Sequence, residues 1–73
     1  MSPNVRSTIL SRLAGFKPKE LDTFIATAEK RAEDMLPLNI ERNTFMESRT
    51  VEDFINHLAA FIRFLEMNPE VKA

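Results

Sequence analysis

The sequence contains no cysteine, and this absence removes two common ways of stabilising a short chain. None of its 73 residues can form a disulfide or provide a cysteine ligand to a structural zinc ion. A chain of this length makes one domain at most, and its core alone supports a net stability of about 3–5 kcal/mol. We therefore expect a single domain spanning residues 1–73, stabilised by packing or by self-association.

Glycine and two of the three aromatic residue types are also scarce. There is one glycine and no tyrosine or tryptophan, which argues against a β protein rich in tight turns. Because the lone Gly15 is accounted for as a helix end, no glycine-rich loop remains to bind phosphate groups. The 44% hydrophobic and 29% charged residues are typical of an ordinary soluble globular domain.

Long apolar segments are missing as well. No stretch approaches the ~20 apolar residues of a membrane span, and the first residues lack the apolar core of a signal peptide. These features predict a soluble cytoplasmic protein with no membrane association. The net charge of −1 gives no overall attraction to nucleic acid, although residues 1–19 contain four basic residues and no acidic one.

The strongest helical pattern lies between Thr50 and Met67, which holds three of the six phenylalanines. At about 100° per residue, one apolar arc of about 120° contains Val51, Phe54, Ile55, Leu58, Phe61, Ile62 and Leu65. Thr50 is a suitable N-cap with Asp53 three residues later, and Asn68 with Pro69 ends the pattern. We predict a helix over about 51–66, followed by a frayed tail at about 69–73.

Two more helices are predicted upstream. The first covers about residues 3–14, begins at Ser2 and Pro3, and ends at Gly15 in the left-handed conformation. The second covers about 18–36 and ends before Pro37, since proline lacks the amide that a continuing helix needs. Its apolar stripe has alanines at the centre, which favours close packing against the last helix. The stripe consists of Leu21, Phe24, Ile25, Ala28, Ala32, Met35 and Leu36.

The connection over residues 37–49 is too long for a structureless loop in a compact domain. We predict a short helix within 38–48, capped by Asn39 or Asn43 and presenting Phe45 and Met46. The predicted fold class is therefore all-α, a small bundle or orthogonal array of three main helices.

Residues with catalytic or metal-binding chemistry are few. His57 is the one histidine, and Asp53 at i−4 could orient its ring as in a general base. A nucleophile is missing, because there is no cysteine and no serine near His57 in the sequence. Asp22, Glu29 and Glu33 share a helix face but lack the histidines of a helical di-metal site, so a solvated face is favoured. We predict no enzyme activity, no cofactor and no metal.

Residues 11–24, SRLAGFKPKELDTF, resemble the helix-turn-helix element of DNA-binding regulators. Ser11 and Gly15 take the small positions, and the apolar positions are Leu10, Ala14, Phe16, Leu21 and Phe24. The resemblance implies a DNA-binding transcriptional regulator. Its groove-facing residues would be Lys17, Lys19, Glu20 and Thr23, and its phosphate contacts Arg6 and Arg12. The same pattern also fits a plain helical hairpin with glycine in the tight turn.

A second apolar strip on the last helix lies outside the main arc. It consists of Ala60, Phe64 and Met67, with His57 between them. Phenylalanine and methionine on an exposed face are typical of docking surfaces, although the same residues also fill cores. We therefore predict a small non-enzymatic interaction or regulatory module that forms a homodimer through this strip and binds another protein. The helix-turn-helix regulator is the alternative.

Overall fold

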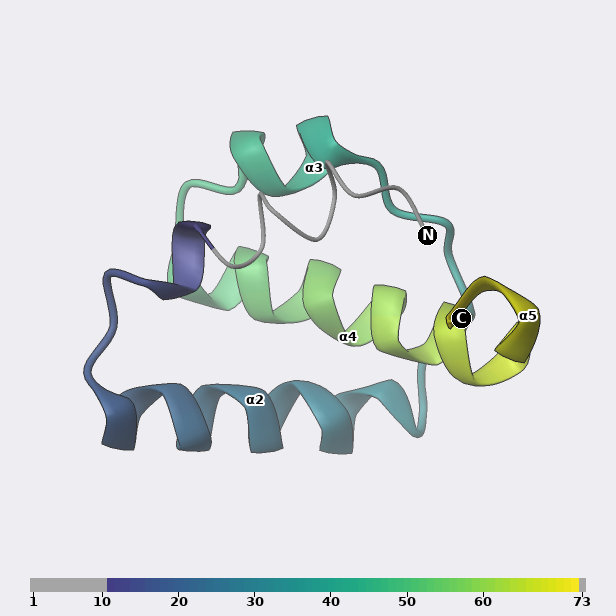
Figure 1. The fold of residues 1–73 in the computed structure, drawn as a ribbon, viewed down its shortest axis with the longest axis horizontal. Coiled ribbons are helices and arrows are strands. Elements are labelled where there is room, and N and C mark those ends of the chain that lie inside the picture. The colour runs from purple at the N-terminus through teal and green to yellow at the C-terminus, as the bar shows by residue number, and fades with distance from the viewer. Residues whose placement is uncertain (1–10, 73) are drawn as a thin grey trace.

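The computed structural model describes residues 11–72, and this part of the chain is all-α, as predicted (Figure 1). Residues 11–13 are helical, and Leu13 is buried. The elements that follow are α2 (Pro18–Ala32), α3 (Arg42–Glu47), α4 (Val51–Met67) and α5 (Pro69–Lys72). Most of the helix predicted over 3–14 lies outside the described residues. None of the described helices is long and apolar enough to cross a bilayer.

Helix α4 is the central element, and it lies between α2 and α3 in Figure 1. The predicted cap is confirmed, because the Thr50 side chain accepts a hydrogen bond of 3.0 Å from the amide of Asp53. Its buried residues are Phe54, Ile55, Leu58, Ala59, Ala60 and Phe61. The prediction for Val51 was wrong: it is 52% exposed, because the first turn of the helix extends past the core.

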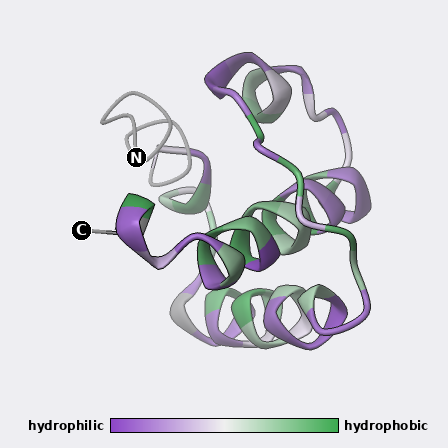
Figure 2. Ribbon diagram, turned by 90° about the vertical axis from the view of Figure 1, so that its right-hand side faces the viewer, coloured by the Kyte–Doolittle hydropathy of each residue, from purple (hydrophilic) through white to green (hydrophobic). Residues whose placement is uncertain are grey.

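Alanines bring α2 and α4 close together, as the stripe of α2 predicted. Ala28 and Ala32 on α2 are fully buried, and so is Ala59 on α4. Small side chains at these positions let the two helices approach closely. Both helices carry apolar and polar sides in the hydropathy view of Figure 2, as amphipathic helices do.

The two helices cross rather than run alongside each other. On one flank of α2, Arg31 pairs with Glu52 at 2.6 Å, in the first turn of α4. On the other flank, Ile25 lines a small cavity with Leu65, near the end of α4. The two ends of α4 therefore lie on opposite sides of α2, and its first turn forms an open angle with that helix.

Helix α2 ends at Ala32, four residues before the predicted end. The last turn closes with backbone hydrogen bonds between residues three apart, including one of 3.2 Å from the Met35 amide to the Ala32 carbonyl. Proline acts further upstream than expected, because the Pro37 ring would clash with the carbonyl of Glu33 in a continuing helix. The residue before proline is also biased away from helix. Leu36, predicted on the apolar stripe, is consequently 79% exposed.

The connection after α2 contains the predicted short helix. Helix α3 begins after Glu41, so neither Asn39 nor Asn43 is its N-cap. Phe45 is fully buried and Met46 is 51% exposed. The helix thus points one of its two large apolar residues into the core.

All six phenylalanines form one continuous series of ring contacts. Successive centroids lie 5.1 to 6.5 Å apart in the order Phe16, Phe24, Phe54, Phe45, Phe61, Phe64. Such tilted and stacked pairs stabilise a core beyond their area alone. The series joins the turn before α2 to α2, α3 and α4.

Residues 69–72 were expected to fray, and in the structure they form the short helix α5. Helix α5 packs against α4. Between the two helices, the Asn68 side chain donates a hydrogen bond of 2.9 Å to the carbonyl of Phe64.

Gly15 does not take the left-handed conformation that the sequence suggested, because its φ is not positive. A Cβ added there would meet only the Arg12 carbonyl oxygen, at 3.9 Å. We expect Gly15→Ala to raise the free energy of unfolding by about 0.4–1 kcal/mol, because alanine reduces the entropy of the unfolded chain. Urea unfolding followed by circular dichroism measures this, and a loss of stability would contradict the observed backbone.

Candidate functional site

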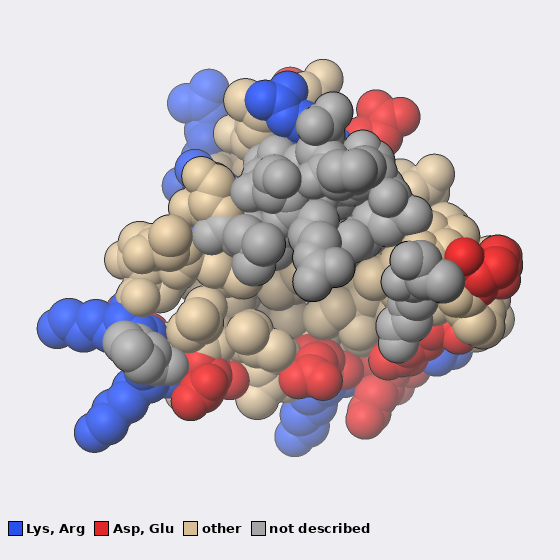
Figure 3. Space-filling view, viewed as in Figure 1, with Lys and Arg blue, Asp and Glu red and all other residues tan. Residues whose placement is uncertain are grey.

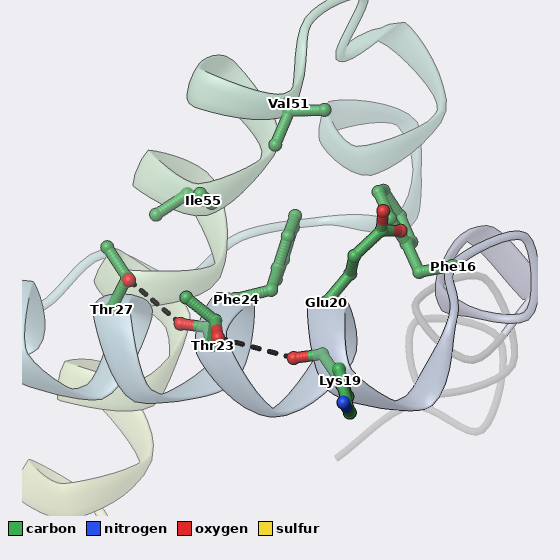
Figure 4. Close-up of a pocket in the computed structure, with 8 residues that line it drawn as sticks. All are labelled: Phe16, Lys19, Glu20, Thr23, Phe24, Thr27, Val51 and Ile55. Carbon is green, nitrogen blue, oxygen red and sulfur yellow. Dashed lines mark hydrogen bonds between the residues drawn. The ribbon is translucent and has the colours of Figure 1, made fainter.

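A groove of about 550 Å³ lies between the first half of α2 and the first turns of α4 (Figure 4). Its apolar lining comes from three elements: Phe16 in the turn, Phe24 on α2, and Val51 with Ile55 on α4. The groove exists because the two helices cross at an angle. At the start of α4 they diverge, and the space between them is left open. Val51 is half exposed there and gives the groove an accessible apolar wall.

Two threonines of α2 add to the apolar character of the groove. The Thr23 hydroxyl donates to the Lys19 carbonyl at 3.2 Å, and the Thr27 hydroxyl donates to the Thr23 carbonyl at 2.8 Å (Figure 4). Because each hydroxyl proton is used within the helix, the side chains offer mainly their methyl groups to a ligand. Lys19 and Glu20 line the groove with one charge of each sign.

A smaller cavity of about 300 Å³ adjoins the groove and shares Phe16 and Val51 with it. Two arginines line this cavity, Arg12 and Arg49. Within residues 11–72, neither guanidinium forms an ion pair with a carboxylate. Of the acids in the first turn of α4, Glu52 pairs with Arg31, and Asp53 lies 3.6 Å from His57 Nε2. The apolar groove therefore has an uncompensated basic end.

Arg12 has a defined position in this cavity. Its guanidinium donates a hydrogen bond of 2.6 Å to the Ser48 carbonyl, at the C-terminal end of α3. It also lies 5.8 Å from the centre of the Phe54 ring. Both contacts are to uncharged groups, so the positive charge is fixed in place without being neutralised.

A Ser48–His57–Asp53 constellation forms nearby, and the sequence analysis missed its serine. The Ser48 hydroxyl oxygen lies 2.7 Å from His57 Nδ1, and His57 Nε2 lies 3.6 Å from an Asp53 carboxylate oxygen. Ser48 is nine residues from His57 in sequence, and the end of α3 brings it alongside. These are the residue types of a hydrolytic triad.

The hydrogen bonds of Ser48 do not suit nucleophilic catalysis. The hydroxyl also lies 2.9 Å from the Thr44 carbonyl, which can only accept, so its single proton goes to Thr44. His57 Nδ1 therefore donates to the serine and cannot take its proton. Ser48 is also only 2% exposed. The arrangement fits a structural network that joins α3 to α4.

The four residues predicted as an interface on the last helix do not form one exposed strip. Ala60 is 2% exposed and belongs to the core, contrary to its expected position. Phe64 is half-buried and stacks on Phe61 at 6.5 Å, and His57 faces Ser48. Met67 remains 55% exposed.

The residues suggested by the helix-turn-helix resemblance are only partly brought together. Lys17, Lys19 and Thr23 are exposed at the start of α2, whereas Arg12 is turned toward Ser48, and Arg6 lies outside the described residues. Basic and acidic side chains alternate along α2 at the lower edge of the molecule in Figure 3. The exposed acids of this segment are Glu20, Asp22, Glu29, Glu33 and Asp34. This mixed face lacks the basic stripe that attracts phosphates.

No protein-family model, curated protein or solved structure matches the chain. Function must therefore be inferred from the chemistry of these sites.

Proposed function

We propose that the protein is a small, non-enzymatic interaction or regulatory module of the cytoplasm, which self-associates and binds protein partners. The observation that carries this proposal is the groove between α2 and α4, about 550 Å³ in volume and lined mainly by apolar side chains. Grooves of this size and character receive apolar side chains of a ligand or partner. The adjoining arginines add a charged contact that would favour one orientation of the partner.

The groove supports the proposal better than the strip on the last helix. Val51 and Phe16 meet in an accessible cavity, whereas Ala60 and Phe64 are engaged in the core. Interface energy comes mainly from large residues that fill well-formed pockets. We therefore place the main binding surface at the groove.

Val51→Asp is expected to reduce partner binding at least about tenfold, because it puts a carboxylate in the apolar wall. The fold should tolerate this change, since an acidic residue suits the first turn of a helix. Met46→Asp is the matched control, because Met46 is 51% exposed and Val51 is 52% exposed. The immobilised chain and its two variants are compared by affinity capture from native lysate, with retained proteins quantified by mass spectrometry. Equal retention by all three would contradict binding at the groove.

A further inference from the structure

Residues 33–38 carry a second set of features that the fold of one chain does not use. Leu36 is 79% exposed and Leu38 is 52% exposed, although leucines normally lose most of their surface on folding. Glu33 and Asp34 precede them, are exposed, and form no ion pair among the described residues. The segment thus presents two carboxylates followed by two leucines.

The groove and the cavity that adjoins it present the complementary features. Its apolar part is lined by Phe16 and Val51, and the adjoining cavity holds Arg12 and Arg49 without carboxylate partners. A leucine in the groove would place a carboxylate two residues away within reach of the arginine cavity, since two residues span no more than about 7 Å. The exposed leucine would then be buried against the groove, and the carboxylate would have an arginine partner.

A single chain cannot make this contact with itself. The groove lies at the start of α2, and residues 33–38 follow the opposite end of that helix (Figure 1). The 15 residues of α2 hold this segment about 22 Å from Phe16, at the far end of the groove, although the groove lining extends along α2 as far as Thr27. The segment that reaches the groove must come from another molecule.

We propose that a second copy of this chain fills the groove with its residues 33–38. Leu36 of that copy packs between Phe16 and Val51, and the carboxylates of its Glu33 and Asp34 pair with Arg12 and Arg49. This rests on the proposed function and names the partner in it. With two α2 helices antiparallel, each copy inserts its segment into the groove of the other, and the pair closes as a two-fold dimer.

A stable dimer also needs enough contact area. A stable interface of standard size covers about 800 Å² of each partner, roughly a sixth of the 5165 Å² surface of this chain. Each copy contributes both a groove and a segment, so every contact is made twice. We expect a reversible dimer in the micromolar range, because only a few side chains of each copy are anchors.

Sedimentation velocity of the purified chain, from low to high micromolar concentration, tests the dimer. We expect Leu36→Asp to raise the dimer dissociation constant at least about tenfold. Met67→Asp, which alters an exposed residue of the last helix, is expected to leave it unchanged. Leu36 and Met67 are both exposed, so neither variant should unfold the monomer. A chain that stays monomeric, or a dimer weakened by Met67→Asp and not by Leu36→Asp, would overturn the proposal.

A charge exchange tests the pairing itself. Arg49→Glu and Asp34→Arg should each weaken the dimer, and the double variant should recover affinity because the charges are again opposite. Equal weakening in the single and double variants would refute the pairing. If the chain is monomeric while capture of a different protein still depends on Val51, this inference fails together with the self-association in the proposed function, and the binding of protein partners at the groove stands.

Discussion

Replacing Phe45 with alanine is expected to unfold most of the protein at room temperature. Phe45 is fully buried and touches two other rings, Phe54 at 5.4 Å and Phe61 at 6.0 Å between centroids. Removing a buried phenylalanine side chain costs about 3–5 kcal/mol, which equals the whole stability expected for a domain of this size. Helix α3 has six residues and cannot persist without that contact.

Met46→Ala is the control, because Met46 is its neighbour on α3 and is half exposed. We expect it to change the free energy of unfolding by no more than about 0.5 kcal/mol. Thermal and urea unfolding followed by circular dichroism at 222 nm compares the two variants with the wild type. If Phe45→Ala kept a cooperative transition with less than about 1 kcal/mol of lost stability, the central position of Phe45 would be wrong.

Signals that act within one or two helical turns were readable from the sequence. The cap at Thr50, the apolar arc of α4 and the alanine stripe of α2 each depend on residues three or four apart, and all three are present in the structure. The early end of α2 was also a local effect, but it was misjudged. Pro37 was treated only as a missing amide, whereas its ring also excludes the helical carbonyl at Glu33.

Features that depend on how helices cross were not readable. The helical periodicity of apolar residues predicted Val51 and Leu36 in the core. Both are exposed, because they lie at or beyond helix ends that extend past the crossing. The groove follows from that crossing, so no sequence period predicts it. Ser48 reaches His57 only because Phe45 anchors α3 against α4. Ser48 and His57 are nine residues apart and lie on different segments, so helical periodicity could not predict their contact.

Ala28→Leu is expected to lower the free energy of unfolding by about 1–3 kcal/mol, through overpacking at the helix crossing. Ala28 is fully buried on α2 and lies on the face that meets Ala59, also fully buried, on α4. Three added carbon atoms have no space there, so either the backbones separate or the leucine adopts a strained rotamer. Helix propensity does not oppose the change, since leucine forms helices nearly as well as alanine.

Ala26→Leu separates packing from propensity, because Ala26 is exposed on the same helix. It should change stability by no more than about 0.5 kcal/mol in the same urea titration. Equal stability of the two variants would mean that α2 and α4 are not in close contact at Ala28. The prediction also bears on function, because the groove is bounded by these two helices. A separation at Ala28 moves Val51 away from α2, so Ala28→Leu should weaken partner binding even in the fraction that remains folded.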